Sequence, residues 1–316
     1  MDLLKPRLVS LLRCPSCIGR LTLHAKTEEK GEITEGRLAC AKCNVVYPIV
    51  RGIPRFVPND QYVHSFSFQW NLFAQTQLDK TKKLDVDNYT TFEERTGFRG
   101  DDLEHKLVLE AGCGMGRFID VVANVESAEV VGFDLSLAVE SAFANVGSRP
   151  NVHILQADIL QPPLAQETFD IVYSIGVLHH TPSPSASFLR LVSLLKRGGN
   201  IAIWVYPKYE WAMLSDVYRQ VTTRLPWSML LGVVKVMTTL HAIDDKMPRF
   251  LHHCADLLLP VSGQSDPESK ILGTYDWYSP KYQFKSTNQT ILSWFRHAGL
   301  VDVTFLEFPG AVRGRR

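Results

Sequence analysis

Short apolar runs, separated by helix-like segments, occupy the middle of the chain. Five of these runs predict strands, at residues 107–110, 130–134, 152–158, 169–174 and 198–205. Apolar runs of this length between turn signals are typical of strands, and their alternation with helical segments is typical of a parallel sheet. The pattern predicts an α/β fold with a doubly wound, mostly parallel sheet.

The first run leads into a glycine-rich turn, in which Gly112, Gly114 and Gly116 follow Glu110. Glycine lets the backbone turn sharply and approach a ligand closely, because it has no Cβ. In a dinucleotide site the third glycine comes one residue later and the ligand is a pyrophosphate, which Glu110 would repel. S-adenosylmethionine carries an ammonium, a sulfonium and no phosphate. The pattern E-x-G-x-G-x-G therefore indicates that cofactor.

Acidic residues end the next two strands. Asp134 follows the glycines at the spacing of a carboxylate that accepts both ribose hydroxyls. Asp158 is placed to accept the adenine amino group, and Ile159 to pack on the ring. The residues expected to bind the cofactor are Glu110, Gly112, Gly114, Gly116, Asp134, Leu135, Asp158, Ile159 and Ser174.

In this order, the motifs resemble the class I S-adenosylmethionine-dependent methyltransferases, most closely the broad small-molecule subgroup often called type 11. The resemblance covers roughly residues 102–206 and resumes near the C-terminus. It implies a Rossmann-like methyltransferase sheet and an enzyme that transfers a methyl group. The motifs say little about the substrate.

Two C-x2-C pairs stand near the N-terminus, Cys14 with Cys17 and Cys40 with Cys43. This is tetrahedral zinc spacing, and it predicts one structural Zn²⁺ rather than disulfides. With residues 11–15 and 45–57, the pairs resemble the small zinc-ribbon proteins that activate tRNA and other methyltransferases, here fused to the enzyme. A bacterial 23S ribosomal RNA guanine methyltransferase also carries such a ribbon, which leaves an RNA substrate open.

His179 and His180 follow the fourth strand, which ends at Ser174. Many amino and base methyltransferases carry Asp or Asn before Pro-Pro-Tyr at this place. The chain lacks that run, which counts against N-methylation of a base amine. A histidine at the carboxyl edge of the sheet can accept the proton that methyl transfer releases. The alternative is that one histidine caps the next helix and the other is buried and hydrogen-bonded.

From residue 207 to about 285 the chain departs from the minimal fold, with apolar segments that predict helices at 210–225, 227–241 and 246–259. Because they follow the fifth strand, we expect a helical lid over the carboxyl edge, enclosing a fairly apolar small molecule. A dimer interface is the alternative. The segment 275–282 suits a ring-containing or cationic substrate, and the alternative is a loop pinned by its aromatic side chains. Its site candidates are Asp276, Tyr278 and Tyr282.

The remaining segments complete this outline. In the aromatic-rich linker at 59–84, Phe66 and Phe73 are expected to dock the ribbon on the core. For Gln69 and Trp70 the alternative is a helix that closes over the cofactor, as in related methyltransferases, and Trp70 is left open. Residues 89–102 are expected to be helical. A helix at 287–298 and a sixth strand at 301–308 leave residues 311–316, so a seventh strand is either very short or missing from a trimmed chain. The predicted domains are a ribbon (1–58), a linker with N-terminal helices (59–101), the cofactor-binding core (102–206), the insertion (207–285) and a C-terminal helix and strand (286–316).

Positively and negatively charged side chains are nearly equal in number. The chain has 34 Lys and Arg against 33 Asp and Glu, a net charge of +1, so it has no overall electrostatic footprint for nucleic acid. The N-terminus lacks the apolar region of a secretory signal, and the nearly uncharged stretch 225–242 contains Pro226 and Gly232. We therefore expect a cytoplasmic enzyme without a membrane span.

The expected substrate is a small, partly apolar organic molecule, methylated at O, N or C. A homodimer through the insertion is the expected assembly, if there is one, and nucleic acid is the less favoured partner. The alternatives are an RNA base methyltransferase whose ribbon grips the RNA, and a subunit that binds the cofactor but only supports a partner.

Overall fold

The computed structural model describes residues 5–29, 32–57, 87–208, 213–244 and 260–316. The larger of its two sheets has seven strands, in the order β10 (Val301–Phe305), β11 (Ala311–Arg315), β9 (Leu195–Trp204), β8 (Phe169–Ile175), β5 (Leu107–Ala111), β6 (Glu129–Asp134) and β7 (Val152–Gln156). The pairs from β9 to β7 are parallel, and β11 runs antiparallel to β9 and β10. The predicted sheet is confirmed, and the seventh strand is the five-residue β11.

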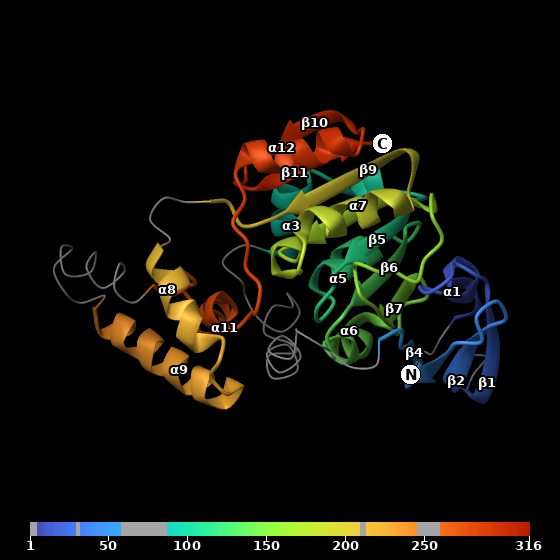
Figure 1. Cartoon of the computed structure of the whole chain (residues 1–316), viewed down its shortest axis with the longest axis horizontal. Helices are drawn as coiled ribbons and strands as arrows, with labels where there is room; N and C mark the ends of the chain where they lie inside the picture. The colour runs from blue at the N-terminus through green and yellow to red at the C-terminus, as the bar shows by residue number, and fades with distance from the viewer. Residues whose placement is uncertain (1–4, 30–31, 58–86, 209–212, 245–259) are drawn as a thin grey trace.

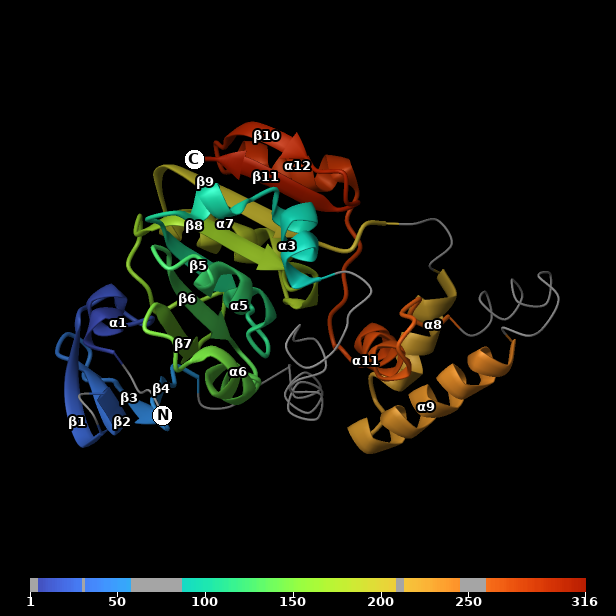
Figure 2. The same cartoon turned by 180° about the vertical axis from the view of Figure 1, so that it is seen from behind.

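Helices cover both faces of this sheet (Figures 1 and 2). Leu107 and Leu109 of β5 belong to one core cluster, whereas Val108 between them belongs to the other, as the alternation of a strand requires. The helices on the Leu109 face are α7 (Pro184–Leu194) and α12 (Asn288–His297). Those on the Val108 face are α3 (Asn88–Thr96), α5 (Arg117–Ala123) and α6 (Val139–Val146). The short helix α4 (Gly100–Leu103) leads into β5. The segment 89–102 thus forms two helices rather than one.

The N-terminal unit is a zinc ribbon. It contains α1 (Pro6–Leu11) and an antiparallel sheet of β1 (Leu21–Glu29), β2 (Glu32–Cys40), β3 (Val46–Val50) and β4 (Ile53–Pro54). Just after β4, Arg55 forms a parallel bridge with Gln156 of β7, and the Phe56 N–H donates to the Gln156 carbonyl at 2.9 Å. The ribbon thus lies against the edge strand of the large sheet (Figure 1). Its backbone pairs with groups of β7 that an open edge would leave exposed.

A second backbone contact joins the start of the ribbon to the loop after β7. Leu12 bridges Leu164 in antiparallel register, and the Arg13 N–H donates to the Pro163 carbonyl at 2.8 Å. The Ala165 N–H donates back to the Leu11 carbonyl at 3.0 Å. Two separate sets of backbone hydrogen bonds therefore fix the ribbon on the core.

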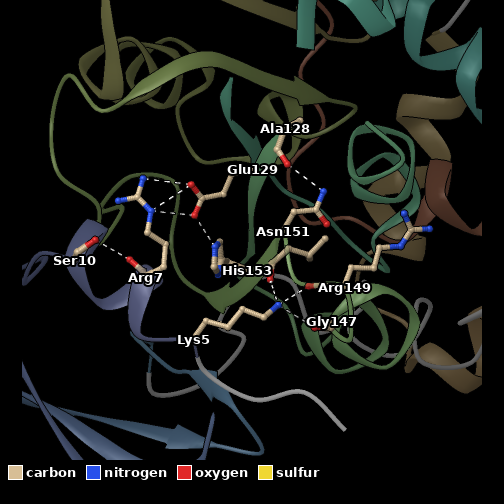
Figure 3. A network of polar contacts seen from close by, with 10 residues as sticks. Lys5, Arg7, Ser10, Ala128, Glu129, Gly147, Arg149, Asn151 and His153 are labelled. Carbon is tan, nitrogen blue, oxygen red and sulfur yellow. Dashed lines mark hydrogen bonds and ion pairs between the residues drawn. The ribbon is translucent and has the colours of Figure 1, made fainter. Parts of the chain in front are cut away.

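Charged side chains surround this junction (Figure 3). The Lys5 ammonium donates to the Val152 carbonyl at 2.8 Å and to the carbonyl of Arg149. The Arg7 guanidinium lies 3.2 Å from Glu129, which also contacts His153 Nε2 at 2.9 Å. The hydrogen bond from His153 lowers the pKa of Glu129, with smaller contributions from the charges of His153 and Arg7. The carboxylate of Glu129 is thus held in its charged form beside the ribbon.

A helical unit follows β9 and consists of α8 (Met213–Thr222), α9 (Trp227–Asp244) and α11 (Pro267–Tyr278). It has a small core of its own, formed by Leu230, Val234, Tyr275 and Tyr278. The first two predicted helices are therefore present, and the third, at 246–259, lies outside the described residues. The alternative of a loop at 275–282 is wrong for its first half. Asp266 caps and Pro267 starts a helix that continues to Tyr278.

Much of the apolar surface of α8 and α9 is exposed. The exposed apolar side chains here are Val217, Val221, Trp227, Met229, Val233, Val236 and Leu240. Within the part of the chain that the structure describes, no helix has the length and apolarity needed to cross a membrane.

Candidate cofactor and acceptor site

The glycine-rich turn after β5 has a backbone that other residues rarely adopt. The φ angles of Gly112, Gly114 and Gly116 are 82°, 50° and 88°. A Cβ at Gly112 would lie 2.3 Å from Cγ2 of Val177, which follows β8. Positive φ and close approach both require glycine, so the turn can lie tightly against the carboxyl end of β8.

Asp134 at the end of β6 holds this turn in place. Its Oδ2 accepts a hydrogen bond from the Gly114 N–H at 2.9 Å. Its Oδ1 accepts from the Ser136 N–H at 2.8 Å and from the Ser136 hydroxyl at 2.6 Å. Burial raises the pKa of Asp134, and these hydrogen bonds to the carboxylate oppose that rise. The acid expected at the ribose therefore lies directly beside the glycines.

Glu110 lies in the interior rather than on an open surface of the turn. Its carboxyl is buried and accepts a hydrogen bond from the Tyr173 hydroxyl at 3.1 Å. Burial raises its pKa well above the usual value, which favours the neutral acid. The expected attraction of Glu110 for the cationic cofactor stays a prediction. The observed contact ties β5 to β8.

The other predicted cofactor residues lie at the same edge of the sheet. Asp158 follows β7, is partly exposed, and accepts the Leu160 N–H at 2.9 Å. Leu135 and Ile159 are buried beside the two acids. The Ser174 hydroxyl is buried and donates to the Ala111 carbonyl at 2.8 Å, so its observed contact joins β8 to β5.

His179 is buried in the short 3-10 helix η2 (Leu178–His180). Its Nδ1 lies 3.2 Å from the Tyr206 N–H, which can only donate, so Nδ1 must accept. The neutral ring then carries its proton on Nε2, which is buried and has no hydrogen-bond partner among the described residues. Burial lowers the pKa of His179 well below the usual value, and His180 and Arg219 lower it further. This geometry does not suit the base predicted for His179.

His180 has the opposite tautomer. Its Nδ1 lies 2.8 Å from the Tyr282 carbonyl, which can only accept, so Nδ1 carries the proton. In the neutral ring Nε2 therefore has a lone pair. Burial lowers the pKa of His180, and the neighbouring carboxylate of Asp276 opposes that effect. Of the two predicted bases, only His180 has a ring nitrogen suited to accept a proton.

Tyr206 connects the sheet to the helical unit. Its ring stacks on His179 with centroids 3.8 Å apart, and its hydroxyl donates to Asp276 Oδ2 at 2.9 Å. Asp276 therefore reaches the region predicted for the acceptor. Tyr278 does not, because it is buried in the helical unit and its hydroxyl donates to the Pro260 carbonyl at 2.8 Å.

Besides Tyr206, three residues of this region were absent from the sequence prediction. The Arg95 guanidinium on α3 lies over the ring of Trp204, 4.2 Å from its centroid. Arg219 is buried and donates to the carbonyls of Trp277 and Pro280 at 2.9 and 2.6 Å. Of these three, only Trp204 could have been found as a site residue from the sequence, because it lies at the end of the fifth predicted strand. The arginines are brought here only by the fold.

The four cysteines of the ribbon meet at one point. Their sulfur atoms lie within 4.8 Å of one another, with Cys14 3.5 Å from Cys43 and Cys17 3.4 Å from Cys40. Zn–S bonds of about 2.3 Å in a tetrahedron place sulfurs roughly 3.8 Å apart, so the four thiols fit Zn²⁺. Burial raises the pKa of Cys14, but hydrogen bonds, first that of the Tyr47 hydroxyl, bring it down to about 6. The cluster is a closed, structural zinc site.

Two family models match the chain. Residues 109–203 match the model described as a methyltransferase domain, and residues 5–52 match the one described as Trm112p-like protein. The chain therefore contains a class I S-adenosylmethionine-dependent methyltransferase domain behind a Trm112p-like zinc ribbon, as the sequence motifs predicted.

Curated relatives resemble the methyltransferase part. A tRNA U34 carboxymethyltransferase of Marinobacter nauticus is 33% identical over 106 residues, which are 32% of this chain and 32% of that protein. A sterol 24-C-methyltransferase of Pneumocystis carinii is 28% identical over 159 residues, 49% of this chain and 39% of that protein. The chain spans about a third of the length of these relatives.

A solved complex of the Haloferax volcanii Trm112 methyltransferase activator with a methyltransferase is also similar. The match has 14% identity and a TM-score of 0.45, and it covers 79% of this chain and 96% of that one.

These comparisons correct the expected substrate. The prediction of a small organic acceptor, with nucleic acid less favoured, is wrong. The tRNA U34 carboxymethyltransferase name recurs among relatives of 33–35% identity, above the 28% of the sterol enzyme. The ribbon independently matches a Trm112p-like protein. The near-neutral total charge and the absent Pro-Pro-Tyr run misled the prediction, because neither feature excludes an RNA substrate for this fold.

Proposed function

We propose that this chain is an RNA methyltransferase that modifies a base of tRNA, with the ribbon acting as a built-in counterpart of a Trm112-type activator. One observation carries the proposal. A Trm112p-like ribbon lies on edge strand β7 of a methyltransferase sheet, held by backbone hydrogen bonds from Phe56 to β7 and from Arg13 to the loop after it. The tRNA-modifying names of several relatives support the substrate class.

The residues at the carboxyl edge fit S-adenosylmethionine, which supplies the methyl group on its sulfonium when bound. The turn at Gly112–Gly116 lets the backbone approach the methionine part closely. We propose that the carboxylate of Asp134 accepts from the ribose hydroxyls and that of Asp158 from the adenine amino group. We propose that Leu135 and Ile159 pack against the adenine ring from their buried positions.

The acceptor lies between these residues and the helical unit. We propose that His180 Nε2, which has a lone pair in the neutral ring and is buried like Nε2 of His179, accepts the proton that the acceptor loses. Asp276 favours the charged form of His180 and, through the Tyr206 hydroxyl, fixes the position of the Tyr206 ring. His179 donates a hydrogen bond from Nε2 and thereby orients the acceptor. It does not remove the proton.

The division into domains supports this assignment of roles. We propose a ribbon at 1–58, a linker at 59–101, a core at 102–206 with its end at 286–316, and an insertion at 207–285 that helps to cover the acceptor. Four zinc-binding thiolates fit a reducing compartment, and we propose the cytoplasm.

The test is transfer of tritiated methyl groups from S-adenosylmethionine into total tRNA. Asp134→Asn removes an acceptor for the Gly114 N–H and the cofactor's ribose, and transfer should fall at least 100-fold. Asp170→Asn is the matched control, because Asp170 also accepts a backbone N–H, that of Leu107, but stands at the opposite end of the sheet. A wild-type protein that binds the cofactor yet leaves tRNA unlabelled would contradict the proposed function.

A further inference from the structure

Arg95 stands in the last turn of α3 with its guanidinium between two aromatic rings. The guanidinium carbon lies 4.2 Å from the ring centroid of Trp204 and 4.7 Å from that of Phe308. The two rings are themselves 5.8 Å apart in an edge-to-face arrangement. The rings hold the planar cation in one position, and they leave its N–H groups to find oxygen acceptors elsewhere.

No acceptor for this cation exists among the residues that the structure describes. The Nε atom of Arg95 is buried without a hydrogen-bond partner, and no described carboxylate forms an ion pair with it. Burial lowers the pKa of Arg95 to about 10, with Tyr206 and Glu94 opposing this effect. The group is still protonated at neutral pH. A cation taken out of water without a partner costs free energy, which a ligand can offset.

Other buried or partly buried guanidinium groups of the chain, unlike that of Arg95, have hydrogen-bond acceptors. Arg55 bonds Glu140 and the Gln156 side chain, and Arg219 bonds two backbone carbonyls. Arg149 bonds Asp120. The missing acceptor is therefore a feature of Arg95 and not of buried arginines in this fold.

A chain of contacts links Arg95 to the cofactor turn. Trp204, which lies against the guanidinium, is also next to Gly176, where a Cβ would come 3.2 Å from the Trp204 ring. Gly176 precedes Val177, which touches the turn at Gly112. On its other side Trp204 contacts Tyr206 and His179 edge to face. Arg95 thus flanks the acceptor region at the carboxyl ends of β8 and β9.

We propose that Arg95 binds a phosphate oxygen of the acceptor RNA, beside the nucleotide whose base is methylated. The inference rests on the proposed function. RNA presents one phosphate per nucleotide, and a guanidinium matches two phosphate oxygens with parallel N–H bonds. Sequence-specific RNA sites splay bases out of single-stranded loops onto aromatic side chains. Trp204 and Phe308 give Arg95 the surroundings of such a site, and the phosphate supplies an acceptor for N–H groups of a guanidinium that is only partly buried.

The probe is the total tRNA that accepts methyl groups from the wild-type enzyme, and its dissociation constant is measured over a range of salt concentrations. Arg95→Gln should weaken binding at least 10-fold. It should also make the slope of log K against log salt shallower by roughly 0.7–0.9, the effect of one lost phosphate contact. Arg95→Lys should keep the wild-type slope and part of the affinity.

Arg99→Gln is the matched control. Arg99 lies four residues further on, is exposed, and is paired with Glu93 at 2.7 Å, so its loss should change affinity less than twofold. Affinity for S-adenosylmethionine should be unchanged in both variants. The melting temperature of Arg95→Gln should change little, because among the described residues the arginine has ring contacts but no hydrogen-bond or ion-pair partner to lose.

Three outcomes would overturn the inference. Arg95→Gln could match Arg99→Gln in affinity and slope. It could lose affinity for S-adenosylmethionine instead, which would assign the cation to the cofactor's carboxylate. It could melt at a lower temperature with unaltered RNA binding, which would make it structural. A wild-type protein that neither binds nor labels tRNA contradicts the proposed function itself, and that result is distinct from these three.

Discussion

Two adjacent histidines, equally buried, have opposite hydrogen-bonding roles because of the backbone atoms that face them. An N–H group faces Nδ1 of His179, and a carbonyl faces Nδ1 of His180. Each backbone group allows one tautomer, so the protein sets which ring nitrogen can accept a proton. Residue identity alone could not separate the two.

Replacing these histidines should therefore have unequal effects. His180→Gln should lower kcat for methyl transfer by about 100-fold or more, the usual contribution of a general base. His179→Gln should stay within about tenfold, because its amide can still accept the Tyr206 N–H and donate to the acceptor. Equal losses in both variants would contradict the assignment.

The pH profile gives a second check on His180. A base works in its neutral form, and burial lowers the pKa of His180 below its usual 6.5. Wild-type kcat should therefore hold as the pH falls to 6.5 and decline only when the pH passes through the lower folded pKa. A decline that is already half complete above pH 7 would argue against His180.

Ile18, directly after the first zinc knuckle, has a left-handed backbone with φ of 61°. Asn44 occupies the same place after the second knuckle, with φ of 59°. A β-branched residue is strained there, whereas Asn tolerates this conformation. Ile18→Asn should raise the free energy of unfolding by about 1 kcal/mol, since Ile18 is 58% exposed and little burial is lost.

Asn44→Ile is the reciprocal control and should destabilise the protein by a similar amount. Urea unfolding of the zinc-loaded chain measures both changes. If the two substitutions shift the midpoint in the same direction, strain at the knuckles is not the cause.

Among the elements, the ribbon and strand β7 form the junction on which the proposed function depends. Arg55 is nearly buried there and bonds both Glu140 and Gln156. Arg51 pairs with the same Glu140 at 2.8 Å, but its side chain is 70% exposed. The two arginines thus test a buried and an exposed contact to one carboxylate.

Arg55→Met should lower the free energy of unfolding by about 3 kcal/mol, because Glu140 and the Gln156 side-chain oxygen lose their buried donor. Arg51→Met should change it by less than about 1 kcal/mol, as expected for an exposed ion pair. Thermal unfolding of the full chain measures the difference. Similar values for the two variants would show that this contact does not secure the ribbon.

The strands and zinc ligands could be predicted because their signals are local. Apolar runs, the glycines at 112–116 and the C-x2-C spacing each determine structure within a few residues. The acceptor region could not be predicted in the same way. Arg95, Tyr206 and Arg219 come from three distant segments, and the sequence does not show that Tyr278 turns inward while Asp276 reaches Tyr206. Helix α11 was also partly read as a loop, because its aromatics mask the capping signal at Asp266.

At the scale of the whole molecule, one polypeptide joins a zinc ribbon to a methyltransferase core. The ribbon segment has too little core of its own to fold without its metal. One equivalent of zinc per chain is expected by elemental analysis. Removing it with a strong chelator should lower the melting temperature and release the ribbon from β7, which hydrogen exchange of the Phe56 amide would detect. Unchanged exchange after complete zinc loss would contradict the structural role.

The most direct test of the account identifies the methylated product. The wild-type protein is incubated with total tRNA and S-adenosylmethionine bearing a trideuterated methyl group. The tRNA is then digested to nucleosides, which are separated and identified by mass spectrometry. We predict one nucleoside that gains the labelled methyl group with the wild type and with Asp170→Asn, and not with Asp134→Asn. Label that is absent from every tRNA nucleoside, while the protein still binds the cofactor, would contradict an RNA methyltransferase.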